Sequence, residues 1–273
     1  EHLRLRLRGR PLAAPDLRLA AAVGQQVDGV LERDRLRAEA RASRVERERG
    51  AMRTALLAAV SHDLRTPLAA IKAGMGAVRA AGTGISVADR EELLEDVDIN
   101  ADRLQLLIDN LLDMSRLDAG AVTPRLDLVA LDEVVPRAVD SVPVGAVTVD
   151  VRETLPLIRA DAGLLERALA NLVENAVRHT PAGTPVRVGA QCVGEQLIIR
   201  VTDHGPGVPE GRKEQMFTAF QRLGDAPRGQ GLGLGLAVAR GFVEANGGTL
   251  EAEDTPGGGL TMVISLPLTG ESR

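Results

Sequence analysis

Two stretches of the chain repeat apolar residues at steps of three or four, the pattern of an α-helix with one apolar stripe. In the first stretch, over 52–78, the stripe is Leu57, Val60, Leu64, Leu68, Ile71, Met75 and Val78, and in the second it is Leu93, Val97, Ala101, Leu104, Ile108 and Leu111. Residues 81–84, Ala-Gly-Thr-Gly, interrupt the pattern. Ser86, three residues before Asp89, marks the start of the second helix, and Gly120 marks its end. The sequence therefore predicts an antiparallel helical hairpin over 51–120.

Two helices bury too little apolar surface alone, so we expect the hairpin to pair with that of a second copy in a four-helix bundle, which makes the protein a homodimer. Residues 28–50 are rich in Arg, Glu and Ala and predict an exposed connecting helix. Residues 3–8 alternate Leu and Arg, the pattern of a half-buried strand. We interpret 1–27 as the remnant of a preceding domain; the alternative is an edge strand of the domain that follows.

The pattern changes after Pro124 to short strands and helices. Apolar runs predict strands at 147–151, 186–191, 197–201, near 249 and at 261–266, and helices at 162–178 and 236–245. This mixture predicts an α+β domain over 125–270.

Composition excludes several classes of function. The chain has 273 residues but only three Phe and no Trp or Tyr, too few aromatic rings for a surface that stacks nucleic-acid bases. A net charge of −5 argues against binding to a phosphate backbone. The single cysteine, Cys192, excludes an intrachain disulfide and a cysteine metal cluster, and we expect a buried thiol. No apolar run approaches the roughly 18 residues of a membrane span, so we expect a soluble chain.

One histidine stands out on the first helix. At about 100° per residue, His62 falls almost opposite the apolar stripe, and Thr66 follows one turn later on the same outer face. Pro67 lies inside the helical pattern, where proline costs about 3 kcal/mol, and suggests a kink beside a site. The neighbouring Asp63 could hold one imidazole proton and leave the other nitrogen nucleophilic. The alternative is an exposed histidine without function.

Three polar residues share one stripe of the helix at 162–178. Asn171, Asn175 and Arg178 follow at i, i+4 and i+7. Amide oxygens suit a Mg²⁺ ion that shares phosphate oxygens, and a guanidinium suits a phosphate directly. The alternative is an ordinary polar outer face.

Glycine-containing segments follow two strands. Residues 203–207, Asp-His-Gly-Pro-Gly, come directly after the strand at 197–201. Their glycines let the backbone approach a flat ligand, and the Asp203 carboxylate can accept from an exocyclic amine, although a plain turn is the alternative. Residues 229–236 alternate glycine with other residues and open a helix, whose free amides favour phosphate oxygens. Residues 257–259, all glycine, predict a hairpin turn.

Taken in order, these motifs resemble those of the sensor histidine kinases of two-component systems. The residues around His62 resemble the phosphoacceptor box and 171–180 the N box. Residues 203–207 and 231–236 resemble the two glycine boxes, and 216–220 the phenylalanine box. The resemblance covers about 50–270. Segments 61–68, 220–225 and 254–259 are most similar to the potassium-sensing members, in which a GAF domain precedes the kinase core.

The resemblance implies a dimeric helical hairpin followed by an α/β-sandwich ATP-binding domain of the Bergerat type. It implies that His62 attacks the γ-phosphorus of ATP–Mg²⁺, with Asp63 as base, and that the phosphoryl group passes to an aspartate of a response regulator. Thr66 would orient water for dephosphorylation of that regulator, Asn175 would hold Mg²⁺, and Asp203 would bind adenine. The ATP pocket would comprise Asn171, Asn175, Arg178, His179, Asp203, Gly205, Gly207, Phe217, Phe220, Gly231, Leu232, Gly233, Leu234 and Gly235.

Two positions depart from the family pattern. His179 occupies a place where the family usually has an aromatic residue beside adenine. The alternating glycines allow two registers of the second glycine box, and Ala237 with Arg240 favours the one that starts at Gly231. The family also implies the cytoplasmic core of a membrane protein.

Two other functions remain open. ATPases of the same fold place a Glu one turn before the Mg²⁺-binding Asn. That position is Asn171 here, and Glu174 is expected on a different face. The other alternative is a dimeric ATP-binding scaffold without catalysis.

Overall fold

The computed structural model describes residues 13–81, 84–221 and 233–268, and divides the chain into two units, Glu1–Ala59 and Val60–Arg273. Helix α1, Ala14–Ala81, begins in the first unit. The predicted connecting helix and first hairpin helix are thus parts of one helix. Residues 14–27, which we assigned to a preceding domain, are helical, and the strand expected at 3–8 lies outside the described residues.

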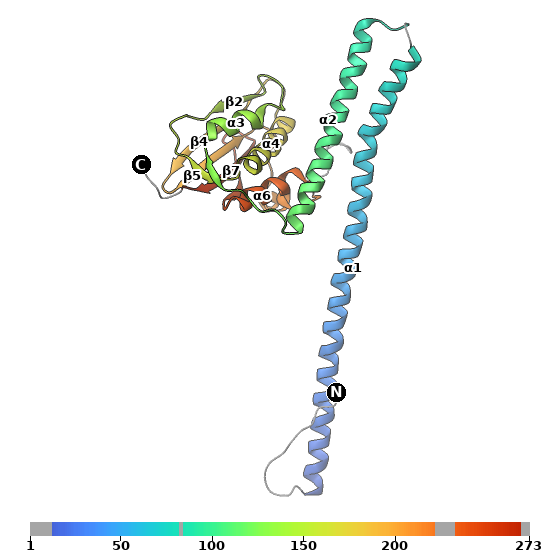
Figure 1. Cartoon of the computed structure of the whole chain (residues 1–273). Helices are drawn as coiled ribbons and strands as arrows, with labels where there is room; N and C mark the ends of the chain where they lie inside the picture. Colours follow the sequence, from blue (N-terminus) through green and yellow to red (C-terminus); the bar gives the residue numbers. More distant parts are fainter. Residues whose placement is uncertain (1–12, 82–83, 222–232, 269–273) are drawn as a thin grey trace. The chain divides into compact units, whose positions relative to one another are not determined.

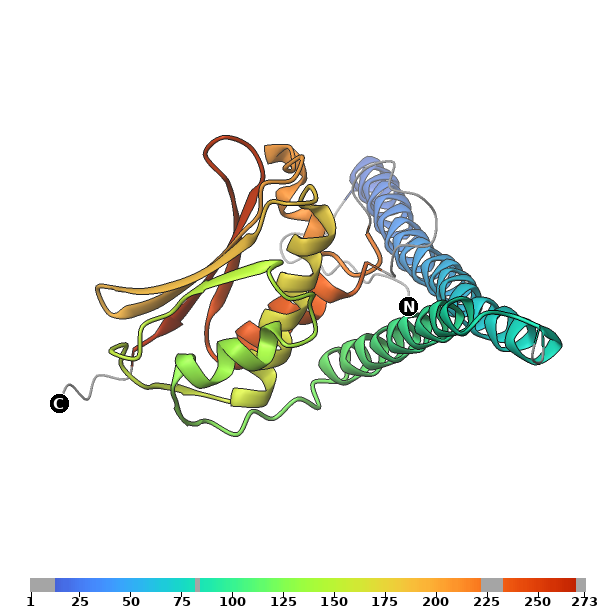
Figure 2. The same cartoon turned by 90° about the horizontal axis from the view of Figure 1, so that it is seen from above.

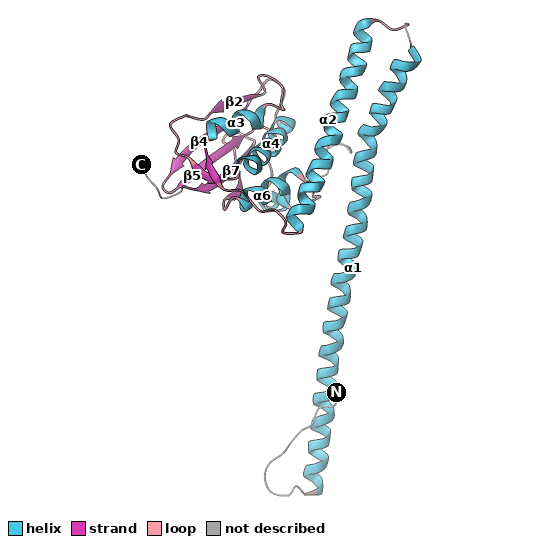
Figure 3. Ribbon diagram, in the orientation of Figure 1, coloured by secondary structure: helices cyan, strands magenta, loops and turns pink. Residues whose placement is uncertain are grey.

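The helical hairpin is confirmed in the second unit, where the end of α1 packs against α2, Val87–Asp118 (Figures 1 and 3). The Ser86 hydroxyl accepts the Asp89 N–H at 3.1 Å, which caps α2 as predicted. The two helices approach closely at Gly74, where a Cβ would lie 2.7 Å from the Val97 side chain. Helix α1 continues through the buried Pro67.

A five-stranded sheet forms the second part of this unit. Its order is β2 (Val147–Asp150), β4 (Val186–Val193), β5 (Gln196–Thr202), β7 (Leu260–Pro267), β6 (Thr249–Asp254). Only β2 and β4 run parallel, and the other neighbours are antiparallel. A separate antiparallel pair joins β1 (Asp127–Val129) to β3 (Ile158–Ala160).

Three helices cover one face of the sheet: α3 (Leu131–Val139), α4 (Ala162–His179) and α6 (Gly235–Ala245) (Figure 2). Between the helices and the sheet, Leu169, Leu172, Ile199, Phe242 and Ile264 are almost fully buried. Two short turns of helix, α5 (Glu210–Lys213) and η1 (Gln215–Phe217), follow β5. The predicted α+β class is confirmed.

The thiol of Cys192 is exposed, so the prediction of a buried thiol was wrong. Cys192 lies near the end of β4, whose last three residues are all exposed, in the hairpin that β4 forms with β5. The alternation of apolar residues along a strand predicts which side of the sheet each side chain faces. It does not predict how far along the strand the helices cover that side.

Candidate nucleotide-binding and phosphoacceptor sites

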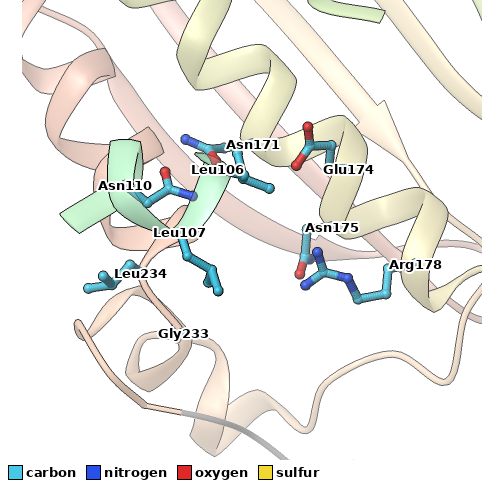
Figure 4. A pocket seen from close by; sticks show the side chains of 9 residues that line it. All are labelled: Leu106, Leu107, Asn110, Asn171, Glu174, Asn175, Arg178, Gly233 and Leu234. Carbon is cyan, nitrogen blue, oxygen red and sulfur yellow. The ribbon is translucent and has the colours of Figure 1, made fainter. Parts of the chain in front are cut away.

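The predicted polar stripe on α4 lines a cavity of about 60 Å³. Helix α4 starts at the N-cap Asp161, whose carboxylate accepts the Leu164 N–H at 3.1 Å. Figure 4 shows the lining residues, which come from two helices and the segment before a third: Asn171, Glu174, Asn175 and Arg178 on α4, Leu106, Leu107 and Asn110 on α2, and Gly233 and Leu234 before α6. Asn171 is buried, so the alternative of a polar outer face was wrong for this residue.

Glu174 also lines this cavity, which corrects the expectation that it lies on a different face from Asn175. Two adjacent residues of α4 thus border the same cavity. One carboxylate oxygen of Glu174 accepts the Ser141 hydroxyl at 3.3 Å. Burial raises the pKa of the Glu174 carboxyl, which the Ser141 hydrogen bond and Arg178 only partly oppose.

The C-terminal end of α4 meets the first glycine segment. The Oδ1 atom of Asp203 accepts the N–H of Gly205 at 2.8 Å and the N–H of Leu260 at 3.1 Å, while no described residue donates to Oδ2. A Cβ on Gly205 would lie 2.6 Å from the His179 carbonyl oxygen, so only glycine permits this approach. Burial, together with the charge of Arg178, lowers the pKa of His179. The structure therefore brings His179, Asp203 and Gly205 together.

The predicted turn at 257–259 joins β6 to β7 and is confirmed, but its last glycine also packs against the site. Gly259 has φ +113°, and a Cβ there would lie 2.1 Å from the carbonyl oxygen of Asp203. The turn thus packs against the backbone of Asp203, a contact that the sequence pattern did not indicate.

The segment with the two phenylalanines contacts the start of α6. Phe217 is buried, with the Arg240 guanidinium 4.7 Å from its ring centroid. Phe220 has φ +64°, and its N–H donates to the Gly233 carbonyl at 3.0 Å. A Cβ on Gly235 would lie 3.3 Å from the Asn171 side-chain oxygen. Gly231 and Leu232 lie outside the described residues, so the register of the second glycine box stays a prediction.

His62 is presented on the outer face of the hairpin, as predicted. Its side chain is 62% exposed, and its Nδ1 lies 3.0 Å from Oδ1 of Asp63, whose side chain is largely buried. The exposed Thr66 donates its hydroxyl to the His62 carbonyl at 3.2 Å. His62 does not line the cavity at α4. The structure keeps the phosphoacceptor candidate and the α4 stripe apart.

The two parts of this unit nevertheless pack against each other beside His62. Leu234, which is 1% exposed, lies in an apolar cluster with Val60 of α1 and Leu107 of α2. Leu64 and Phe220 cover this cluster. Sequence reasoning missed the contribution of α2 to the site, although Leu107, Asn110 and Asp113 recur at steps of three and mark a second buried face of that helix.

Within the described residues, no group of three or more His, Cys, Asp or Glu side chains could hold a metal ion. The amide oxygens of Asn171 and Asn175 and the carboxylate of Glu174 line the cavity at α4, and such oxygen ligands suit Mg²⁺. No helix in the described part of the chain is long and apolar enough to cross a membrane.

Two family models match the chain in this order: "His Kinase A (phospho-acceptor) domain" over residues 52–120, and "Histidine kinase-, DNA gyrase B-, and HSP90-like ATPase" over 160–270. Sensor protein KdpD of Mycobacterium tuberculosis is 48% identical over 268 residues, which cover 94% of this chain and 31% of that protein. Sensor protein KdpD of Escherichia coli is 37% identical over 246 residues, 88% of this chain and 27% of that protein. The chain thus spans about a third of the length of these relatives.

Two solved structures are similar over most of the chain. The Acinetobacter baumannii histidine kinase AdeS superposes with a TM-score of 0.55 at 21% identity, over 77% of this chain and 98% of that one, and supports the fold. Full-length ShkA in complex with AMPPNP has a TM-score of 0.54 at 30% identity, over 80% of this chain and 46% of that one. From its two matched domains, and from the histidine and asparagine motifs within them, the chain belongs to the sensor histidine kinases of two-component systems.

Proposed function

We propose that this chain is the kinase core of a sensor that phosphorylates His62 with ATP and passes the phosphoryl group to an aspartate of a response regulator. The observation that carries this proposal is the pairing of His62 with Asp63 on an exposed helix face. The polar cavity at α4 and the Asp203 turn supply a site for the phosphate donor.

The geometry at His62 selects the attacking nitrogen. Nδ1 lies 3.0 Å from the Asp63 carboxylate, which would hold the imidazole proton on Nδ1 and leave the Nε2 lone pair available. Nε2 forms a bond to the γ-phosphorus while the bond from that phosphorus to the β–γ bridging oxygen breaks, and ADP leaves. Asp63 stabilises the positive charge that develops on the ring, and accepts its proton as a base.

Several residues of the α+β part have the chemistry that ATP binding requires. Asp203 Oδ2 receives no hydrogen bond from a described residue and can accept from the exocyclic amine of adenine. At the other end of the site, Asn175 would hold Mg²⁺ through its amide oxygen, and Asn171 and Arg178 would bind phosphate or metal. Mg²⁺ supplies charge neutralisation for the transferring phosphoryl group.

We assign the remaining ATP contacts from the resemblance of this sequence to the motifs of the family. Around the adenine end we assign His179, Gly205 and Gly207, and around the phosphates Gly231, Leu232, Gly233, Leu234 and Gly235. Phe217 and Phe220 belong to the segment that borders the nucleotide. We also assign Thr66 to orient water when the phosphorylated regulator is hydrolysed.

Exposed apolar residues on the hairpin support dimerisation. Leu68 is 47% exposed on α1, and Ile99 and Leu112 are at least half exposed on α2. These side chains are suited to the core of a four-helix bundle formed with a second copy.

The regulator that docks on this bundle would be of the KdpE type, and the signal would be potassium limitation or osmotic stress, because relatives named KdpD match nearly the whole chain. The chain would then be the cytoplasmic part of a membrane protein.

One observation favours a second function, ATP hydrolysis. Glu174 lines the cavity next to Asn175, where a carboxylate could activate water. Its hydrogen bond to Ser141 holds one of its oxygens, and Asn171 occupies the position that carries Glu in the ATPases of this fold.

Incubation with ATP labelled at the γ-phosphate separates the alternatives. We expect acid-labile label on the protein, lost in His62→Gln and retained in the matched control His204→Gln, which replaces another exposed histidine. Free labelled phosphate without labelled protein would instead identify an ATPase. Nucleotide binding with neither product would identify a scaffold.

A further inference from the structure

Asn110 of α2 is a largely buried residue whose amide faces the cavity at α4. Its side chain lines the cavity opposite Asn171 and Asn175 of α4 (Figure 4), and the residue is 9% exposed. No described residue makes a hydrogen bond to this amide, whereas the other asparagine of α2, Asn100, donates to the Asp96 carbonyl at 2.7 Å. An amide at the wall of a polar cavity, without a hydrogen-bond partner among the described residues, is available to bind a ligand that enters the cavity.

The cavity has the size of a phosphate group with water, since one water needs only about 10 to 15 Å³ of such space. It is far too small for a whole nucleotide. Its polar lining of three Asn side chains and Arg178 suits phosphate oxygens and the water shell of Mg²⁺. The Asn110 amide offers N–H donors for phosphate and an oxygen for a metal-bound water.

The packing of α2 fixes Asn110 in this place. One turn further along α2, the buried Asp113 forms an ion pair with Arg167 of α4. A turn before Asn110, Leu107 packs in the apolar cluster with Leu234. Leu117, near the end of α2, is so close to α6 that a Cβ on Gly241 would lie 2.6 Å from it. Asn110 is therefore held toward the cavity from both sides along the helix.

We propose that Asn110 is a ligand of the phosphate end of the bound Mg²⁺–nucleotide, so that the hairpin itself supplies part of the ATP site. This inference rests on the proposed function, because it assumes that the cavity at α4 receives phosphate. It makes nucleotide affinity depend on the phosphoacceptor hairpin as well as on the α+β domain.

The test compares Asn110→Leu with the matched control Asn100→Leu in the full chain. Titration calorimetry gives the affinity of each variant for Mg²⁺–AMPPNP and for adenosine, which lacks phosphates. We expect Asn110→Leu to weaken Mg²⁺–AMPPNP binding about tenfold, as for one hydrogen bond to a charged group, and to leave adenosine binding unchanged. Asn100→Leu should change neither.

Equal affinities of the two variants for Mg²⁺–AMPPNP would overturn the assignment. An equal loss of affinity for adenosine and for Mg²⁺–AMPPNP in Asn110→Leu would also overturn it, because such a loss indicates a general disturbance of the domain. Asn110→Ser, which keeps a small polar group and little bulk, carries the same comparison if the leucine variant does not fold. A wild-type chain that binds no Mg²⁺–AMPPNP would refute the proposed function itself, whereas a wild type that labels His62 but shows no effect at Asn110 refutes this inference alone.

Discussion

The ion pair between Asp113 and Arg167 gives the sharpest test of how α2 is held against α4. The Asp113 side chain is 3% exposed and the Arg167 side chain 42% exposed. Arg167 also lies 5.6 Å from the centroid of the Phe242 ring. Replacing Arg167 by Met keeps most of the contact with Phe242 but leaves the buried carboxylate without its closest cation.

Breaking a buried pair from one side costs about 3 to 5 kcal/mol, and the exposure of Arg167 reduces this, so we expect a loss of about 2 kcal/mol in the free energy of unfolding at neutral pH. The matched control is Arg116→Met. The Arg116 side chain is 65% exposed and its Nη1 lies 3.9 Å from Asp113, so that variant should lose less than about 1 kcal/mol.

The loss should depend on pH. Burial raises the pKa of Asp113 above 3.8, and the attraction of Arg167 opposes this only in part. The folded state therefore holds the Asp113 proton more tightly than the unfolded state, and the charged carboxylate destabilises the fold as pH rises above 3.8 through the raised pKa. Without Arg167 the pKa rises further. The difference between wild type and Arg167→Met should thus be largest near about pH 7.5 and shrink toward about pH 4.

Urea titration followed by circular dichroism measures these differences, and hydrogen exchange over residues 107–117 shows whether α2 separates from α4 before global unfolding. Equal losses for the two arginine variants at about pH 7.5, or a loss that does not change with pH, would show that Asp113 is not confined as described.

Three further predictions concern the α+β domain. His179→Tyr should leave ATP affinity, measured by calorimetry, equal or higher, since a tyrosine ring adds stacking at the place where the family has an aromatic; a clear loss would mean that adenine does not lie there. Gly259→Ala should destabilise the domain by at least about 2 kcal/mol in thermal or urea unfolding, because the new Cβ meets the Asp203 backbone, and more than Gly258→Ala, which has a similar φ but no atom within 4 Å; equal losses would refute the contact. Asp161→Ala should cost about 1 to 2 kcal/mol in unfolding free energy, because Asp161 caps α4 and also accepts the Arg125 N–H at 2.8 Å; a loss below about 0.5 kcal/mol would contradict the cap.

Helices and strands with a regular repeat of apolar residues were predictable from the sequence. The hairpin, α4 and the strands β4, β5 and β7 follow their apolar patterns, and the Ser86 cap formed as predicted. The predicted helix at 162–178 and the observed α4, Ala162–His179, differ by one residue. In these segments local pattern and tertiary packing favour the same structure.

Elements that depend on tertiary contacts were not predictable. Helix α3 was missed because it has only nine residues and contains Pro136, which a sequence pattern treats as a breaker. The strands β1 and β3 have three residues each and pair only with one another. The continuity of α1 from Ala14 was missed because its first part has a mixed composition without one apolar stripe.

The candidate site divides in the same way. Motif residues within one helix or one turn could be grouped from spacing alone, as for the stripe on α4. The residues that α2 contributes to the site could not be grouped in this way. Asn110 reaches the cavity, and Asp113 reaches Arg167, only because α2 packs on α4 and α6. Glu174 was misplaced because adjacent residues of a helix diverge in direction, yet both Glu174 and Asn175 border this cavity.

The exposed Cys192 offers a practical advantage. It is the only cysteine of the chain, so a maleimide spin label would attach at one known position on β4 without any substitution. In a dimer each copy would carry one label, and the single distance between them, measured by pulsed electron resonance with and without nucleotide, would report movement of the two α+β domains. Cys192, whose burial was wrongly predicted, is thus an existing attachment site for a label that reports motion.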